Sequence, residues 1–321
     1  MNSPLRRAAL FAFLVLTFSL VAQSQVLEKD VRAELGFLAS DALQGRGSGT
    51  TFERIAAEYI GSQFRQFGLE PGGDTDSAGN KSFVQRVALQ DGETWNAIGI
   101  LRGSDPTAAK EAILLSAHLD HLGVNESLTG DRIFNGADDD ASGCVAVLEL
   151  ARALAAGKRP RRTIYFVGFG SEERGGLGSK YFLNNSPVPL TDIIANLNFE
   201  MLGRPDPKVS ADKLWLTGFE RSNLGPELAK QGAPLVADPH PEQYFFQRSD
   251  NYGLALRGVI AQTVSSFGLH TDYHRPSDEV SKIDFAFMTK AINSMVKAVD
   301  WLANSTFRPA WLPGQAPKPR P

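Results

Sequence analysis

The sequence has little cysteine and no excess of basic residues, and both shortages exclude classes of protein. Its 321 residues include a single cysteine, Cys144, so the chain has no internal disulfide, and any metal ion that it holds must be bound by nitrogen and oxygen ligands. Lysine and arginine number 33 against 36 acidic residues, a formal net charge of −3. This balance, without a basic stripe, argues against nucleic acid as a partner.

Apolar runs long enough to span a membrane are also missing after the first residues of the chain. Residues 8–22 are mainly apolar, follow two arginines, and end in the small-residue pattern Ala22-Gln-Ser24, a combination typical of a secretory signal peptide. The run is short for a span. We therefore predict a signal peptide at residues 1–24 and an exported protein, periplasmic or extracellular, without a stable membrane anchor after cleavage. Its net charge is then 31 − 36 = −5, because the removed segment holds 2 of the 33 basic residues.

Periodic apolar patterns predict helices that alternate with strands. Helical spacing occurs in residues 27–43, 51–67 and 141–156, and in a last helix that begins after Asp284. Short apolar runs predict buried strands at residues 96–101, 112–117, 163–169, 193–199 and 259–264. This alternation indicates an α/β fold with a mostly parallel, mixed central sheet flanked by helices. Without a repeat or long linker, we expect one domain at residues 25–307 and a flexible Pro-rich tail at residues 308–321.

Histidine and acidic side chains follow the predicted strands at their carboxyl ends. His118, Glu172, Glu173 and Glu200 each come just after a strand, and His274 lies beyond the last one. Each has an ordinary structural explanation when taken alone. However, parallel strands bring their carboxyl ends to one edge of a sheet, where ligands bind. Two metal ions that share one bridging carboxylate need such a set of histidines and acids.

An acidic turn supplies the candidate bridging carboxylate. The sequence GADDDASG, residues 136–143, precedes a predicted helix, and helix capping explains one of its three acids but not all of them. Asp138 and Asp140 suit the shaping of the turn and the capping of the helix, and Cys144 suits the core.

Five motifs in a fixed order resemble peptidase family M28, the zinc peptidases that include secreted bacterial aminopeptidases. The motifs are HLD, GADDDASG, SEERGGLGS, NFEMLGR and DYHRPSDE, and the resemblance runs from about Leu38, through LQGR at residues 43–46, to about Asp284. It implies a zinc-peptidase fold and an exported aminopeptidase with two zinc ions, which removes N-terminal residues from peptides. Co²⁺ or Mn²⁺ are possible substitutes for zinc.

The resemblance also implies a role for each motif residue. His118, Asp139 and Glu200 would hold one zinc ion and Glu173, Asp139 and His274 the other, so that Asp139 is the bridge. Asp120 would orient His118. Glu172 would be the general base that takes a proton from the attacking, metal-bound water. Tyr273 either donates a hydrogen bond to the oxyanion or is a packed ring. The resemblance further implies a cis peptide bond between Asp139 and Asp140.

Several positions depart from the family pattern or carry no prediction. Most family members have Asp where this chain has Glu200, whose extra methylene shifts the carboxylate by roughly 1.5 Å. We expect His121 and His270 to be hydrogen-bonded structural histidines, and we assign no role to His240 or to Asn251, which stands where the family often has His. The aromatic run at residues 244–246 is either a wall of the substrate pocket or part of the core.

Two alternatives share this fold. A glutaminyl cyclase-like enzyme uses one zinc ion, and its first histidine is usually not a ligand, whereas His118 is present here. A non-catalytic receptor or binding domain would have lost its ligands, whereas all five ligand positions and Glu172 are occupied by suitable residues. Metal content separates the three hypotheses, with about two ions per chain for the peptidase, about one for the cyclase and none for the receptor.

Overall fold

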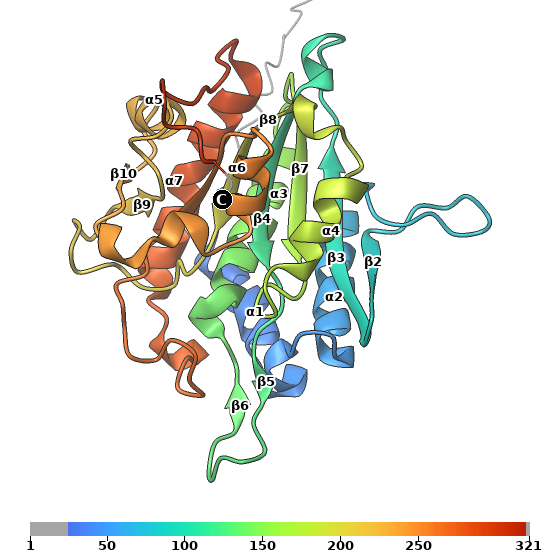
Figure 1. The fold of residues 1–321 in the computed structure, drawn as a ribbon, viewed down its shortest axis with the longest axis vertical. Coiled ribbons are helices and arrows are strands. Elements are labelled where there is room, and N and C mark those ends of the chain that lie inside the picture. The colour runs from blue at the N-terminus through green and yellow to red at the C-terminus, as the bar shows by residue number, and fades with distance from the viewer. Residues whose placement is uncertain (1–24, 319–321) are drawn as a thin grey trace, which may run out of the picture.

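The computed structural model describes residues 25–318, so the predicted signal peptide at residues 1–24 lies outside the described residues. In the described part, nine strands form one sheet in the order β1-β3-β7-β4-β8-β11-β9-β10, with β2 paired to β3. The strands are β1 (Glu70–Pro71), β2 (Val84–Leu89), β3 (Gly92–Leu101), β4 (Ala112–His118), β7 (Thr163–Phe169), β8 (Ile193–Phe199), β9 (Leu214–Leu216), β10 (Leu235–Ala237) and β11 (Ala261–Ser265). A separate ribbon of β5 (Gly123–Val124) and β6 (Ile133–Phe134) projects from the body (Figure 1).

The four central strands of the sheet are parallel. β4 pairs in parallel with β7 and β8, and β8 pairs in parallel with β11. Antiparallel pairs border this block, with β3 against β7 on one side and β9 against β11 on the other. The predicted α/β fold with a mixed central sheet is therefore confirmed. Its parallel block contains the strands whose carboxyl ends carry the candidate residues.

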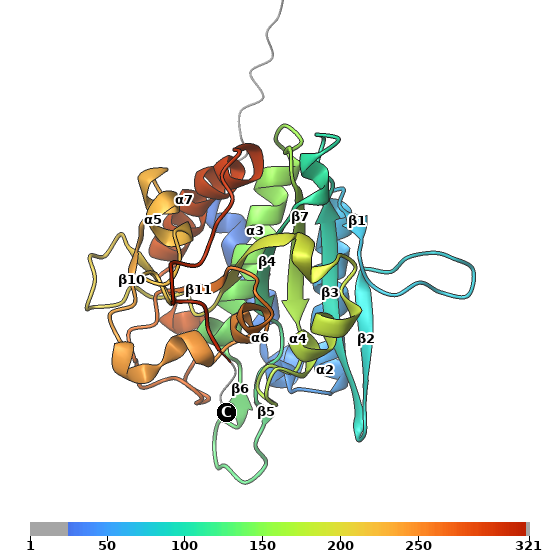
Figure 2. The same ribbon diagram turned by 45° about the horizontal axis from the view of Figure 1, so that its top comes forward.

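Helices cover both faces of the sheet (Figures 1 and 2). The larger group packs on one face and consists of α1 (Glu28–Leu38), α2 (Thr51–Gln66), α3 (Gly143–Ala155), α5 (Leu224–Lys230) and α7 (Phe285–Asn304). The shorter α4 (Leu177–Asn185) and α6 (Asn251–Leu256) cover the other face. β4 contributes to both cores, since Ile113 and Leu115 lie in the first and Leu114 in the second. Burial of each of these apolar side chains stabilises the folded protein by about 1.5–3 kcal/mol.

The boundaries of the helices follow from local polar contacts. Asp284 caps α7, as predicted, by accepting a hydrogen bond from the N–H of Phe287 at 3.0 Å. α1 ends at Leu38 rather than at residue 43, and a short irregular helical turn, Asp41–Arg46, follows it. No helix among the described residues is both long enough and apolar enough to cross a bilayer.

The strand expected at residues 96–101 is longer in the structure. β3 begins at Gly92 and forms an antiparallel hairpin with β2. The apolar pattern does not reveal β2 because the polar side chain of Gln85 is buried there, where its oxygen accepts a hydrogen bond from Asn96 at 2.9 Å.

The first part of the expected flexible tail is held against the body of the protein. The backbone of Trp311 bridges to Ser222, and the N–H of Leu312 donates to the carbonyl of Arg221 at 2.8 Å. The Trp311 ring packs edge-on against Phe246, with ring centroids 6.2 Å apart. We predicted a flexible tail from residue 308 onward, whereas these contacts hold residues 311 and 312 against the body. A proline-rich composition does not indicate that a single tryptophan can make such contacts.

Candidate metal centre

Five of the predicted residues meet at the carboxyl edge of the parallel strands. His118 is the last residue of β4, Glu172 and Glu173 follow β7, and Glu200 follows β8. The loop after β11 carries His274. Because these four strands are parallel and adjacent, residues separated by more than 150 positions approach each other at one place.

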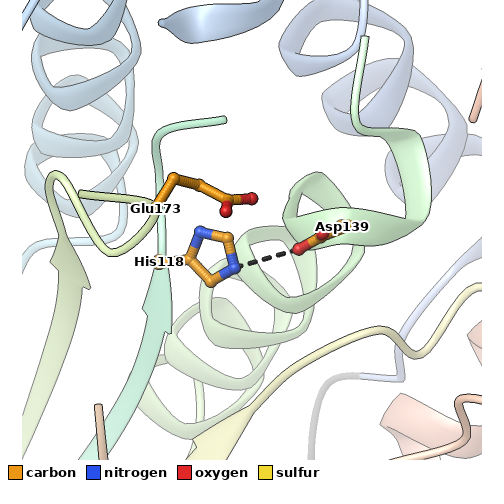
Figure 3. A group of neighbouring side chains, drawn as sticks. All are labelled: His118, Asp139 and Glu173. Atoms are coloured by element: carbon orange, nitrogen blue, oxygen red, sulfur yellow. Dashed lines mark hydrogen bonds and ion pairs between the residues drawn. The ribbon is translucent and has the colours of Figure 1, made fainter. Parts of the chain in front are cut away.

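Asp139 lies between two imidazoles. Its Oδ1 is 3.1 Å from Nε2 of His118, and its Oδ2 is 3.1 Å from Nε2 of His274. Oε1 of Glu173 is 3.2 Å from the same nitrogen of His274. Ligand atoms of His118, Asp139 and Glu173 all lie within 4.8 Å of one another. Figure 3 shows these three side chains converging from the end of β4, the turn before α3 and the loop after β7.

Two oxygen atoms of this cluster lack ordinary hydrogen-bond donors among the described residues. Oδ2 of Asp139 and Oε1 of Glu173 are buried and accept no hydrogen bond of good geometry from the described residues. Burial raises the pKa of Asp139, but the neighbouring His118 and His274 outweigh this effect and hold it well below its usual value. Buried carboxylate oxygens next to imidazole nitrogens form the donor set that Zn²⁺ binds. The residues present therefore fit zinc.

His121 joins the cluster instead of forming the structural hydrogen bond that we expected. Its Nδ1 is 2.9 Å from Oε1 of Glu173 and 3.8 Å from Oδ2 of Asp139. Neither ring nitrogen has a hydrogen bond of good geometry to the described residues. The sequence signal is its place three residues after His118, which leaves it on the same segment beyond the strand end.

Glu172 and Glu200 line the same hollow, of about 490 Å³, as His118, Asp139 and Glu173. Burial raises the pKa of Glu172 well above its usual value, and nearby acids raise it further. Burial also raises the pKa of Glu200 to about 7. Glu200 lies outside the described group of ligand atoms within 4.8 Å, and its Oε2 is 3.5 Å from Nδ2 of Asn198.

Asp120 joins two parts of the site. Its Oδ1 is 3.7 Å from Nδ1 of His118, and the backbone oxygen of Asp120 is 3.2 Å from that nitrogen. The same carboxylate accepts hydrogen bonds from the N–H groups of Glu172 at 2.8 Å and Glu173 at 3.3 Å, and from the hydroxyl of Ser48. Asp120 therefore fixes the loop after β7, a role that the sequence does not reveal.

The outer acids of the acidic turn hold the backbone around Asp139. Asp140 accepts hydrogen bonds from the N–H groups of His118 at 3.1 Å, Gly143 at 3.0 Å and Met201 at 3.1 Å. Asp138 accepts one from the N–H of Gly203 at 2.7 Å. The peptide bond between Asp139 and Asp140 is cis, as the resemblance implies. Asp138 and Asp140 thus shape the turn and the helix start, which agrees with the sequence analysis.

Two further residues that the sequence analysis did not single out support this turn. Asp278 accepts hydrogen bonds from the N–H groups of Asp138 at 3.1 Å and Asp139 at 3.0 Å. Arg46 is fully buried and donates to four carbonyl groups, including those of Leu119 and Gly136, both at 3.0 Å. Their only sequence signal is their presence in the motifs LQGR and DYHRPSDE.

Aromatic side chains form the rest of the hollow. Trp215, Phe245, Phe267 and Tyr273 line it together with the metal-site residues. The ring of Tyr273 stacks on His274 with centroids 3.9 Å apart. Tyr273 is therefore a packed ring that also faces the hollow. Within the run at residues 244–246, Phe245 is part of the wall and Phe246 is part of the core.

The two remaining histidines pair with buried acids away from the cluster. Nε2 of His270 is 2.9 Å from Oδ2 of Asp138, which agrees with the structural role expected for it. Nε2 of His240 is 2.7 Å from Oδ2 of Asp206. Asn251 donates to the carbonyl of Phe246 at 3.2 Å, so this position is part of the packing under the hollow.

Comparisons with known proteins show what the chain is similar to. The model of Peptidase family M28 matches residues 96–299. Leupeptin-inactivating enzyme 1 of Streptomyces exfoliatus is 35% identical over 42% of this chain and 28% of its own length. An aminopeptidase of Pseudomonas aeruginosa is 32% identical over 70% of this chain and 44% of its own length. The chain thus spans less than half the length of these two relatives.

Solved structures show the same fold at lower identity. BSAP, a zinc aminopeptidase from Bacillus subtilis, has a TM-score of 0.67 at 17% identity, covering 87% of this chain and 96% of that one. The LapA aminopeptidase of Legionella pneumophila has a TM-score of 0.66 at 20% identity, covering 87% of this chain and 73% of that one. Together with the family match over most of the sheet and the site, these findings establish that the chain belongs to peptidase family M28.

Proposed function

We propose that this protein is a zinc-dependent aminopeptidase that removes N-terminal residues from peptides. The observation that carries the proposal is the position of Asp139, whose two carboxylate oxygens each lie 3.1 Å from a different imidazole. A carboxylate placed in this way suits a bridge between two metal ions. Relatives of this chain are named aminopeptidase and zinc metalloprotease, which supports the same activity.

The ligand set proposed for two zinc ions uses five residues. One ion would be held by His118, Asp139 and Glu200, and the other by Glu173, Asp139 and His274. Zinc bound there would polarise the scissile carbonyl and lower the pKa of water. His118 and His274 lie on opposite oxygens of Asp139, which supports two ions rather than one.

The residues around the cluster would share the remaining work of hydrolysis. Glu172 would take a proton from the attacking water and pass it to the leaving nitrogen as the peptide bond breaks. Asp120 would keep Glu172 in place through the hydrogen bond from its backbone N–H at 2.8 Å. The Tyr273 ring would orient His274 by stacking, and its hydroxyl would donate to the oxyanion if the substrate brings the two together.

The aromatic part of the hollow suits the side chain of the N-terminal residue. Trp215, Phe245 and Phe267 line it, so it favours apolar and aromatic side chains. We further propose that the protein is exported to the periplasm or the extracellular space, which rests on the predicted signal peptide.

A panel of substrates tests the aminopeptidase proposal. Wild-type protein and the variants Glu172→Gln and Glu220→Gln are assayed with amino-acid anilides, free peptides and N-blocked peptides, with and without chelator. Glu220 is a matched control, because its side chain is 68% exposed and outside the site. We expect chelator-sensitive cleavage of free-amine substrates only, and a loss of about 10²–10⁴-fold in turnover for Glu172→Gln with zinc retained.

Three outcomes would contradict parts of this proposal. Equal cleavage of N-blocked peptides would reject the aminopeptidase assignment and leave the metal site standing. Elemental analysis that finds one zinc ion per chain would favour the cyclase-like enzyme, and one that finds none would favour a receptor-like domain.

A further inference from the structure

A second hollow adjoins the aromatic one at Glu172. It has a volume of about 940 Å³ and lies between α4 and α6. Glu172, Arg248 and Ser249 line both hollows. The proposed general base therefore lies at the boundary between the two hollows. The proposed function assigns a part of the substrate only to the aromatic one.

The chemistry of peptide hydrolysis indicates what the second hollow receives. Glu172 can return its proton to the leaving nitrogen only if that nitrogen lies within hydrogen-bond reach. Because the N-terminal side chain fills the aromatic hollow, the residue after the scissile bond must extend past Glu172 on the other side. A third hollow, beside His274, is a weaker candidate, since Glu172 is not among the residues that line it.

Cations that form no ion pair with the described residues border this second hollow. Lys180 on α4 and Arg257 just after α6 are both exposed, and within residues 25–318 neither forms an ion pair. With Arg248 they give three cations against two acids, Glu172 and Asp250. Asp250 interacts electrostatically with Lys180 without forming an ion pair. The second hollow is therefore positively charged on balance and suits an anion.

We propose that the second hollow binds the residue that follows the scissile bond and that Lys180 and Arg257 recognise a carboxylate on that residue. The inference rests on the proposed aminopeptidase function. In a dipeptide, the terminal carboxylate lies two covalent bonds from the leaving nitrogen, whereas a longer peptide has a neutral amide there. The preferred substrate class is therefore dipeptides, or peptides whose second residue is acidic.

Three substrates that differ in whether and where they carry a carboxylate test the inference. They are leucyl-glycine, leucyl-glycinamide and the α-amide of leucyl-aspartate, whose side-chain carboxylate is free, assayed as kcat and KM on the zinc-loaded protein. We expect the wild type to prefer leucyl-glycine to its amide, and the double variant Lys180→Met/Arg257→Gln to lose about tenfold of that preference, mainly through KM. The charge-conserving double variant Lys180→Arg/Arg257→Lys should keep most of it. Lys297→Met, which removes an exposed lysine on α7, is the matched control.

The outcomes separate this inference from the proposed function. If none of the three substrates is cleaved, the aminopeptidase proposal fails. If the amide and the free acid are cleaved equally well by the wild type, or if the double variant keeps the full preference, the inference is wrong and the aminopeptidase proposal stands. A preference for the α-amide of leucyl-aspartate over leucyl-glycine would identify the side-chain carboxylate as the recognised group.

Discussion

Replacing Asp120 by Asn tests whether one carboxylate holds both halves of the site together. In the wild type, Oδ1 of Asp120 accepts the N–H of Glu172 at 2.8 Å, and Oδ2 accepts the N–H of Glu173 at 3.3 Å and the hydroxyl of Ser48. An Asn side chain offers one oxygen and one NH₂ group. Whichever way it is oriented, the NH₂ group faces a backbone N–H and leaves that donor without an acceptor.

The cost of this substitution follows from the bonds that it removes. One buried N–H without a partner costs about 1–3 kcal/mol, and the remaining bonds lose the part of their strength that comes from the negative charge. We expect Asp120→Asn to lower the free energy of unfolding of the metal-free protein by about 3 kcal/mol. Zinc affinity should fall by about 10–100-fold, because Asp120 also lies beside the outer ring nitrogen of His118.

The measurement combines denaturant unfolding of the metal-free protein with zinc titration against a competing chelator. Asp212→Asn is the matched control, because Asp212 is 53% exposed and makes only a 3.9 Å ion pair with Lys213. The reasoning is refuted if Asp120→Asn unfolds within about 0.5 kcal/mol of the wild type and binds zinc within about twofold of it. If only the stability is unchanged, the role of Asp120 is confined to the metal ligand His118. If only the zinc affinity is unchanged, its role is confined to the loop after β7.

Two further predictions concern the support of the site and the helix layer. Arg46→Lys should lower the free energy of unfolding by about 2–5 kcal/mol in denaturant unfolding. An ammonium group has fewer N–H donors than a guanidinium group and leaves at least one of the four buried carbonyl groups without a donor. The exposed Arg54→Lys on α2 should change this free energy by less than about 0.5 kcal/mol. Burial and the neighbouring Glu149 raise the pKa of Glu34 well above its usual value of 4.5, so its contribution to stability is present at low pH and is lost as the pH rises through the raised pKa. Unfolding measured from pH 4.5 upward should therefore show Glu34→Gln gaining on the wild type, and a pH-independent difference would contradict this.

The sequence predicts the parallel block of the sheet well because its strands are continuous apolar runs. β7 and β8 have the predicted bounds, and β4 extends only one residue further, to His118. A strand buried on both faces needs apolar side chains on both, which makes its limits visible in the sequence. The candidate ligands follow directly, since they come just after these limits.

Elements outside this block are harder to predict, because they are very short or depend on buried polar groups. β9 and β10 each have only three residues, too few for a periodic pattern. Arg46 is fully buried, although arginine is mostly exposed in proteins, because four carbonyl groups surround it. The place of His121 in the cluster is also hard to predict, because it depends on how the segment after β4 turns back toward Glu173.

The carboxylates that suit zinc would repel one another in the metal-free protein if all of them were ionised. Four carboxylates, those of Asp139, Glu172, Glu173 and Glu200, line one hollow. Burial raises the pKa of Glu172 and Glu200, so these groups tend to hold protons, while Asp139 stays ionised next to His118 and His274. In the metal-free protein, protons on acids and imidazoles therefore supply the positive charge that divalent cations would otherwise supply. Asp138, Asp140 and Asp278 accept hydrogen bonds from backbone N–H groups instead, so the fold holds the repelling carboxylates of the hollow together through a framework of acids that does not need the metal.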